Sequence, residues 1–578
     1  MPRAGRTGVE AGFLGAGMRV EDEKMTERTQ FPAAAGFEGV AFIAAAACLI
    51  WLGGGRPALA EEPKLEPAVV VRAIQPERQA AAVIDLFAGS RAANPAAALA
   101  AWRRATGNHD AIGKPLQAVA ALFNPEMVSE WRAFHGARFD LAVEGARPGP
   151  LWALIAPKDD GALAALITSL RLSGGADEPP ILDPPIAVER LGGPGAALAA
   201  RLSGATVFAS HRDMLAAEIQ RFRAGMADPP ATDLFKPDDS GFAITLRPDR
   251  IAVDERVAPG LARVATTARG LGLVVTDGWF GLEADRLELE LVSRFQSEGE
   301  GGADVKAPSE LDPAWLAWFP ERESAAAVAV VLGPGAEFWD GLFQVADAID
   351  RAVPARAELA PLRSRLTFLA LARGVRLEAD LWPLLRGASA GLLVEDGLMG
   401  RPRGIVVALH AADPQGARRI LDRVVAPLAG AGRPKPVAEA APGSEASPLV
   451  LGRVSGRPLE AVARGATVLV AWGEGALSRA LQSAETPEKS VAALLDKETG
   501  DDRPVNRFGV IQAGRAALAL GAWGPNSPFA AALVSASPVV WRGGWRDGLA
   551  WDSARWPNLR GLVARFLERI PQEPFEAP

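Results

Sequence analysis

The stretch GATVFA at residues 204–209 returns as GATVLV at residues 465–470. Small and β-branched residues in a short run are typical of a buried strand. Each run leads into an amphipathic segment, residues 212–222 after the first and residues 475–483 after the second. A predicted strand followed by a predicted helix therefore occurs twice. We interpret the chain as a tandem duplication.

Further segments match in the same chain order, which chance similarity between alanine-rich stretches would not preserve. The matched pairs are 137–145 with 388–396, 149–156 with 404–411, 162–170 with 417–428, 186–191 with 449–454, 241–244 with 509–512 and 274–280 with 539–546. The last pair aligns Gly278-Trp279 with Gly544-Trp545. Because the offsets between matched segments differ only by loop-sized steps, the two copies are expected to differ mainly in their loops.

The pattern inside each copy predicts an α+β fold. LELEL at residues 287–291 alternates strictly, which indicates a half-buried strand with one solvated face. Asp547-Gly548 is a β-hairpin turn signal. Hairpins, and strands with one solvated face, indicate antiparallel sheets that helices cover on one face, rather than a doubly wound sheet. The polar, glycine-rich stretch 298–308 is interpreted as a linker between repeat 1 (61–297) and repeat 2 (309–578).

The first 60 residues resemble an export signal. Residues 40–52 (VAFIAAAACLIWL) carry no charge, but they are fewer than the roughly 20 residues that span a bilayer. Ala58-Leu59-Ala60 offers the small residues that signal peptidase requires, so we expect cleavage after Ala60. The alternatives are an uncleaved anchor, a disordered leader and lipidation at Cys48. Initiation at Met25 would give a leader of more usual length.

Composition excludes several classes of function. The 578 residues are 49% hydrophobic and 23% charged, which is typical of a globular protein of two to four domains. A net charge of −7 offers no basic field for nucleic acid. The single cysteine, Cys48, lies in the apolar run, so the mature chain would have no disulfide and no thiolate metal site. The four histidines are far apart in sequence, and neither a metal nor a cofactor is expected.

Two short segments match the sequence motifs of catalytic sites but lack the secondary structure or the partner residue that those sites need. GASAG at residues 387–391 spells the nucleophile elbow of serine hydrolases, in which a strand precedes the serine and a helix follows it. Here the order of predicted elements is reversed, so we interpret Ser389 as part of a turn from helix to strand; only His410 follows it. His211-Arg212-Asp213 begins like a kinase catalytic loop, but Glu218 stands where asparagine is needed. Asp213 is expected to cap the helix that begins there.

The carboxyl-terminal hairpin is the one unusual composition with a functional interpretation. Tryptophan and arginine alternate there, and the candidate ligand-binding residues are Trp541, Arg542, Trp545, Arg546 and Trp551, with Arg555 and Trp556 beyond them. Exposed tryptophan beside arginine can stack on sugar rings or on peptide aromatics. The alternative is structural, because one sheet face could bury all three candidate tryptophans against helices, and Trp279 holds the matching place in repeat 1.

One segment resembles a known group of proteins. Residues 384–428, with LHAADPQGA at residues 409–417 in their centre, and more weakly residues 139–170, resemble duplicated extracytoplasmic bacterial proteins of the planctomycete type, a domain of unknown function. Repeat 1 has Asp159-Asp160 where the pattern has Asp-Pro. The resemblance implies a location outside the cytoplasm and no particular activity.

Together these patterns favour an exported, periplasmic or secreted, non-enzymatic protein that acts as a binding or structural module of the cell envelope. An envelope protein, a peptide or a glycan is the expected partner, and contact with a membrane is expected only through an uncleaved leader. Two alternatives stay open. One is a hydrolase that uses paired carboxylates converging from both copies, and the other is a carrier of an apolar ligand in a cavity.

Overall fold

The structure, a computed structural model, describes residues 67–569 with gaps. The longest gaps are 107–122, 146–150, 158–175, 192–196, 225–239, 254–272, 296–308, 333–366, 395–401, 430–447, 498–502 and 520–531. The predicted leader with Ala58 and Ala60, the linker 298–308 and the predicted helix at 162–170 lie outside the described residues.

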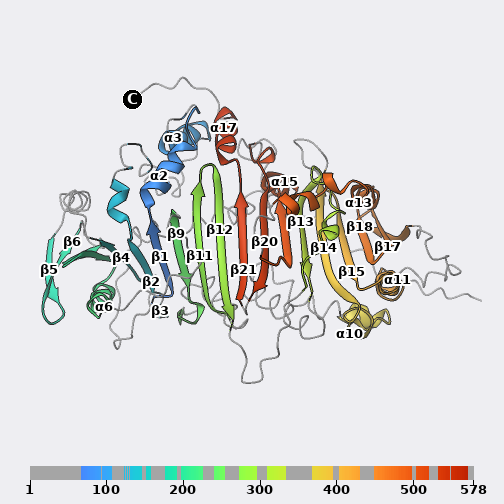
Figure 1. Cartoon of the computed structure of the whole chain (residues 1–578), viewed down its shortest axis with the longest axis horizontal. Coiled ribbons are helices and arrows are strands. Elements are labelled where there is room, and N and C mark those ends of the chain that lie inside the picture. Colours follow the sequence, from blue (N-terminus) through green and yellow to red (C-terminus); the bar gives the residue numbers. More distant parts are fainter. Residues whose placement is uncertain are drawn as a thin grey trace, which may run out of the picture.

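One large antiparallel sheet organises the chain (Figure 1). Its strands, in spatial order, are β5 (Ala176–Ile181), β6 (Ile186–Arg190), β7 (Leu198–Leu202), β8 (Ala205–Ala209), β4 (Leu151–Pro157), β2 (Arg138–Ala142), β1 (Val69–Ile74), β9 (Gly241–Leu246), β11 (Leu273–Glu283), β12 (Arg286–Phe295), β21 (Leu549–Trp556), β20 (Val539–Arg546), β19 (Arg507–Ile511), β13 (Ser324–Val331), β14 (Leu385–Val394), β15 (Pro402–Ala411), β18 (Thr467–Trp472), β17 (Arg457–Arg464) and β16 (Leu449–Val454). Two short strands, β3 (Glu144–Gly145) and β10 (Ala252–Val253), pair in parallel outside it. The predicted combination of antiparallel sheet and helices is confirmed.

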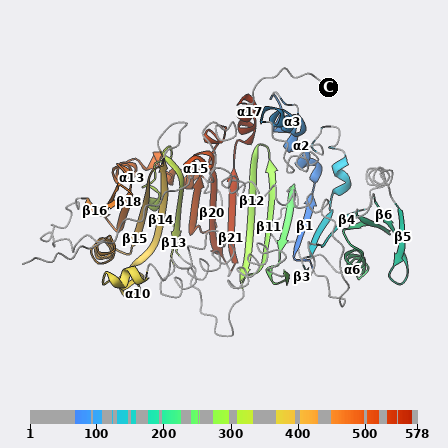
Figure 2. The same ribbon diagram turned by 180° about the vertical axis from the view of Figure 1, so that it is seen from behind.

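The strands of the first half of the chain, up to residue 295, all lie on one side of the centre of the sheet, and those of the second half all lie on the other side. The halves meet where β12 pairs with β21, green beside red in Figure 1, with Glu290 opposite Ser553. Figure 2 shows the same order from behind, with α6 near one end of the sheet and α10 and α13 near the other.

Helices cover parts of both faces of this sheet. The helices are α2 (Pro76–Asp85), α3 (Pro95–Thr106), α6 (Arg212–Arg223), α10 (Leu377–Asp380), α11 (Pro414–Ile420), a π-helical turn (Leu421–Val425), α12 (Ala426–Leu428), α13 (Ala476–Ala484), α14 (Ala492–Lys497), α15 (Ala513–Ala519) and α17 (Leu559–Arg569). Of these, α3 and α17 pack on each other beyond one end of the strands (Figure 1). Short 3₁₀ turns are η3 (Glu130–Phe134), η4 (Pro248–Arg250), η5 (Pro313–Leu316) and η8 (Pro487–Lys489).

Helix starts follow capping chemistry, with one correction to the prediction. Asp413 caps α11 as expected, since its Oδ1 accepts a hydrogen bond from the Gly416 amide at 2.7 Å. The cap of α6 is His211 rather than Asp213, because the His211 Nδ1 accepts from the Asp213 amide at 3.3 Å. Asp213 instead lies in the first turn of α6, where its negative charge favours the positive end of the helix dipole.

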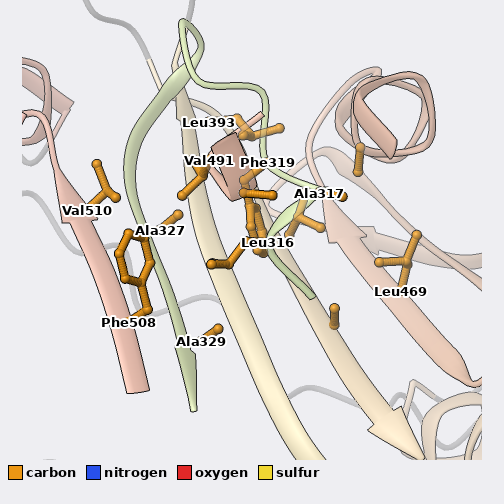
Figure 3. Close-up of a cluster of buried hydrophobic side chains, with 14 of the residues drawn as sticks. Leu316, Ala317, Phe319, Ala327, Ala329, Leu393, Leu469, Val491, Phe508 and Val510 are labelled. Atoms are coloured by element: carbon orange, nitrogen blue, oxygen red, sulfur yellow. The ribbon is translucent and has the colours of Figure 1, made fainter. Parts of the chain in front are cut away.

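Strands of the second half bury both of their faces. Val468 packs into a core with α10 and α11, whereas the next residue, Leu469, packs into a second core with α13, α14 and η5. Figure 3 shows the second core, where Phe319, Phe508 and Leu469 converge from separate elements. Because successive strand residues point to opposite faces, one strand contributes to both cores.

The GASAG motif at residues 387–391 lies entirely within β14, so its interpretation as a turn is wrong. Small residues are needed there because aromatic side chains lie against the strand. A Cβ atom added at Gly387 would overlap the Trp315 ring, and one added at Gly391 would overlap the Phe319 ring. The motif therefore reflects a close approach of side chains to a sheet.

Candidate functional site

The Trp–Arg hairpin predicted at the carboxyl-terminal end exists, and it stands at the centre of the sheet as β20 and β21. Trp541 and Trp545 share one face, since both lie at odd positions of β20. Trp551 pairs with Gly544, so it lies on the opposite face. The prediction that one face holds all three tryptophans is therefore wrong. We call the two sides the Trp541 face and the Trp551 face.

A hydrogen-bonded group fixes Trp541. Its indole Nε1 donates to Asp552 Oδ1 at 3.0 Å. The Arg507 guanidinium donates two hydrogen bonds of 2.9 Å to the same carboxylate, from Nε to Oδ1 and from Nη2 to Oδ2. Such a forked pair is directional, so Asp552 is held in one orientation and in turn holds the indole.

A cavity opens beside Trp541 at the junction of the two halves. Its volume is about 260 Å³, and it is lined by Leu289, Leu291, Trp541, Asp552, Ser553 and Ala554. The leucines come from β12 of the first half, and the other lining residues come from β20 and β21 of the second half. Apart from one carboxylate and one serine, the lining is apolar, which suits an uncharged group more than an ion.

The Trp551 face carries charges that join the two halves. The Arg503 guanidinium lies 4.4 Å from the Trp551 ring centroid and pairs with Glu290 at 2.9 Å. Arg555 Nε lies 3.2 Å from Glu288 Oε1 directly across the β12–β21 ladder. Burial raises the pKa of Glu288, and the neighbouring arginines Arg286 and Arg555 oppose that shift.

The five predicted ligand-binding residues differ in the face of the sheet that they occupy and in whether they line the cavity. Trp541 lines the cavity and is half-buried. Trp545, also half-buried, lies on the same face opposite Ala550 without lining the cavity. Trp551 and Arg542 are buried on the other face, with 3% of each exposed, which makes them part of the packing. Arg546 ends β20 opposite Leu549.

The structure brings together Ser389 and His410, the serine and histidine that the GASAG motif raised. Ser389 Oγ and His410 Nε2 are 2.9 Å apart, and His410 Nδ1 is 3.0 Å from Thr467 Oγ1. Ser389 is 2% exposed and His410 is 1% exposed, so no substrate reaches them. A hydroxyl also occupies the place where a triad has a carboxylate. The pair is a buried hydrogen-bonded group rather than a nucleophile and its base.

The hydrogen bonds around His410 select one tautomer. Ser389 Oγ donates its only hydrogen to the Trp315 carbonyl at 2.9 Å, so His410 Nε2 must donate to Ser389. His410 Nδ1 then accepts from Thr467. Burial lowers the pKa of His410 to about 3, which keeps the ring neutral. The sequence identified both residues but could not show that strand pairing would join them.

A pair of buried carboxyl groups lies in the first half, where sequence reasoning proposed no site. Asp140 of β2 and Glu218 of α6 are both 0% exposed, and Arg138 and Arg221 contact them. A carboxylate hydrolase needs such a pair next to a substrate. Because these carboxyls are fully buried, the pair offers no approach for a substrate, and both members come from one half rather than from both.

Within the described residues, no group of three or more histidine, cysteine, aspartate or glutamate side chains is arranged to hold a metal ion. None of the helices in that part of the chain combines the length and apolar character needed to span a bilayer.

Comparison with known proteins assigns no family. No family model matches the chain, and no curated protein matches it significantly. Among solved structures, a crystal form of TP0453 aligns at 9% identity over 41% of this chain and 81% of its own, with a TM-score of 0.21. A 5-dimethylallyl tryptophan synthase from Streptomyces coelicolor aligns at 11% identity over 70% of this chain and 97% of its own, with a TM-score of 0.09. Scores this low support neither a shared fold nor a shared function.

Proposed function

We propose that the chain is an exported, non-enzymatic binding protein built from two related α+β units, and that its ligand-binding site is the cavity beside Trp541. The observation that carries this proposal is the cavity itself, which lies at the centre of the sheet and takes its walls from both halves. Trp541 is also the candidate ligand residue that lines it.

The size and lining of the cavity favour a small apolar group. The cavity is half open to the surface, and its volume of about 260 Å³ exceeds that of an enclosed apolar cavity of about 150 Å³ that holds benzene in another protein, so one substituted ring or a short branched chain fits. This is smaller than a typical site for a drug-sized molecule. The occupant is therefore one apolar group of a larger partner, such as an aromatic side chain of a peptide or an envelope protein.

Asp552 adds a preference for a ligand that donates a hydrogen bond. Its Oδ1 already accepts from Trp541 and Arg507, while Oδ2 accepts from Arg507 Nη2. A carboxylate oxygen accepts two bonds, so Oδ2 has room for one more donor. A ring that carries a hydroxyl group, as in a tyrosine side chain, satisfies both the apolar walls and this acceptor.

The proposed duplication has support in the order of the strands. Going outward from the centre, the first half runs β12, β11, β9, β1, β2, β4, β8, β7, β6, and the second half runs β21, β20, β19, β13, β14, β15, β18, β17, β16. Each of these nine strands has a counterpart at the same distance from the centre, while β5, which pairs with β6 at the outer edge of the first half, has none among the described strands. β12 and β21 begin 263 positions apart, at Arg286 and Leu549, and Glu290 pairs with Ser553, again 263 positions away.

The cavity is tested by calorimetric titration with p-cresol and toluene, two rings of nearly equal size. The wild-type protein should bind both, with p-cresol about tenfold tighter through the additional hydrogen bond. Trp541→Ala should abolish the preference and weaken both ligands. Trp545→Ala is the matched control, since it removes the same residue type from the same strand and face but not from the cavity. Equal binding by the wild-type protein and Trp541→Ala would remove the proposal.

Export rests on the sequence pattern at residues 40–60 and is tested separately. Mass spectrometry of the protein from fractionated native cells should find an amino terminus at Glu61 in the envelope or secreted fraction. An intact leader in the membrane fraction would mean an anchored protein, and an intact leader in the cytosol would contradict export. Neither outcome changes the expectation for the cavity.

A further inference from the structure

Four charged side chains meet in the interior of the first half, between strand β2 and helix α6. Arg138 Nε contacts Asp140 Oδ1 at 2.7 Å within β2. On α6, Arg221 Nη1 contacts Glu218 Oε1 and also lies 3.6 Å from Asp140 Oδ2. One guanidinium nitrogen therefore serves both carboxyl groups. This cluster links a helix to a strand across an otherwise apolar core.

The hydrogen bonds of the cluster are incomplete when both carboxyl groups are ionised. In the part of the chain that the structure describes, Asp140 Oδ2 and Glu218 Oε2 are buried without a hydrogen-bond partner. Two carboxylates offer only acceptors to one another, and an unmatched buried acceptor is costly. A proton on Glu218 turns one of its oxygens into a donor, and the two carboxyl groups are near neighbours, since Arg221 Nη1 contacts Glu218 Oε1 and lies 3.6 Å from Asp140 Oδ2. One hydrogen would satisfy both oxygens.

We propose that Glu218 and Asp140 share a single proton, and that this proton holds α6 against β2 as a pH-sensitive latch. In the latched state the Glu218 hydroxyl donates to the Asp140 carboxylate. Arg138 and Arg221, each partly exposed, then both contact the one remaining carboxylate, that of Asp140. Loss of the proton to solvent leaves two carboxylates facing each other in the core, and α6 separates from β2 more readily. The latch is independent of the cavity beside Trp541 and of any ligand there.

The electrostatics support this arrangement. Burial, and after it the adjacent Asp140, raise the pKa of Glu218 to about 8, against the lowering effect of Arg221 and Arg138. The described residues of β4, β7 and β8 that share the α6 core are apolar. Arg72 of β1 flanks Arg138 in the ladder. The folded chain thus keeps a proton that the unfolded chain releases above a pH of about 4.5, so folded-state stability falls as pH rises from about 4.5 to about 8.

The second half provides an internal control. Helix α13 follows β18 as α6 follows β8, and it packs against the sheet through Ala476, Leu477 and Ala480. Ala480 lies four residues after Ala476, as Glu218 lies four residues after Met214 at the start of the buried face of α6. The ion pair that α13 makes joins groups of opposite charge, Arg479 and Glu323 at 2.8 Å, rather than two carboxyl groups, so the attachment of α13 should respond to pH in this range far less than that of α6.

Amide hydrogen exchange of the full-length protein between pH 5 and pH 9 tests the latch, with Glu218→Gln as the comparison. Glutamine keeps a donor for Asp140 but cannot ionise. The ratio of wild-type to variant exchange rates in α6 should rise about tenfold per pH unit and level off near pH 8, while the same ratio in α13 stays constant. Parallel profiles of the two proteins in α6 would overturn the proposal.

Infrared spectroscopy of the wild-type protein provides a second test that does not depend on the folding of a variant. A protonated carboxyl C=O band should be present at pH 7 and disappear with a midpoint near pH 8. Asp140→Asn, which can donate to an ionised Glu218, should lower that midpoint. A wild-type spectrum without a protonated carboxyl band at pH 7 would contradict the shared proton whatever the variants do.

Discussion

The imidazole of His410 lies flat against the indole of Trp315, with ring centroids 4.3 Å apart and planes 2° from parallel. The first residue comes from β15, and the second comes from η5, the short turn just after the gap in the middle of the chain. This stacking, with the hydrogen bond from Ser389 to the Trp315 carbonyl, fixes η5 on the sheet. It shows why a serine and a histidine that looked catalytic serve to pack the second half.

The buried neutral His410 should make the protein sensitive to acid. Its pKa is lowered to about 3 in the folded chain, whereas an unfolded histidine takes up a proton near pH 6.5. The unfolded state therefore binds more protons at this position between these values, so the His410 contribution to stability is complete above pH 6.5 and falls below it by about 1.4 kcal/mol per pH unit. The Glu218 contribution has the opposite sign between about pH 4.5 and pH 8, so the quantity to measure is the difference in unfolding free energy between the wild-type protein and His410→Asn, obtained from urea unfolding across pH 4–8. This difference should change by about 1.4 kcal/mol per pH unit below pH 6.5, and a difference that stays constant would assign the acid sensitivity to other groups.

Gly387 should tolerate no side chain. The Cβ of an alanine there would overlap the Trp315 ring, and overpacking of this kind costs about 1–3 kcal/mol. Chemical denaturation of Gly387→Ala measures the loss. Trp315→Leu in the same chain makes room, so the double variant should lose less than the sum of the two single losses. Additive losses would mean that the strand moves away from the ring instead.

The ion pair between Glu288 and Arg555 should couple the two halves. The residues lie directly across the β12–β21 ladder, and both are partly shielded from solvent. A double-mutant cycle with Glu288→Gln and Arg555→Gln should give a coupling free energy of about 1 kcal/mol. The same cycle on Arg286 and Glu283, a pair within one hairpin with the glutamate 67% exposed, should give less. A cycle with no coupling across the ladder would show that this ion pair does not help to join the halves.

Filling the cavity should stabilise the protein and block ligand binding. Ala554 lines the cavity and pairs with Trp541 in the ladder. Ala554→Met should occupy the space with a flexible apolar side chain and raise the free energy of unfolding by about 1 kcal/mol. Thermal unfolding and p-cresol titration on the same sample measure both effects. Greater stability with unchanged binding would place the ligand elsewhere.

Sequence alone predicted the antiparallel α+β character because the alternation at residues 287–291 and the hairpin signals are local. It also placed β16 at Leu449–Val454 and α6 from Arg212. It could not predict that all long strands join one sheet, because pairing such as that of β12 with β21 joins residues far apart in the chain.

Under the proposed duplication, alignment by sequence and alignment by hairpin turns give different correspondences between the halves. Ala205 is the first residue after the turn into β8, and Thr467 is the first residue after the turn into β18. The alignment of the two Gly-Ala-Thr sequences, at 204–206 and 465–467, is therefore shifted by one residue from the alignment of the turns. Since a one-residue shift reverses the face of every side chain, turn geometry is the better guide to register.

The tryptophans of the two hairpins are also out of step with each other. Counted from each turn, the counterpart of Trp545 is Leu282, and Trp279 corresponds to Arg542. When β11 and β20 are aligned at their hairpin turns, the two Gly-Trp pairs therefore lie three positions apart. The shared Gly-Trp pair therefore does not place Trp279 and Trp545 at corresponding positions of the two hairpins.

The cluster of Asp140 and Glu218 had no usable signal in the sequence. Its carboxyl groups come from a strand and a helix separated by more than seventy residues, and neither belongs to a recognisable motif. The His410 group shows the same limit in another form, since the sequence drew attention to Ser389 and His410 without revealing their contact. Sites assembled by long-range pairing are visible only once the register is known.

The most direct test of the binding proposal is the indole N–H signal of Trp541 in a nitrogen–proton NMR spectrum, assigned by its loss in Trp541→Phe. Addition of p-cresol should shift this signal in proportion to occupancy and leave the Trp551 signal, on the opposite face, unchanged. A Trp541 signal that stays in place at saturating p-cresol, or a shift confined to other tryptophans, would contradict the assignment of the cavity as the ligand-binding site.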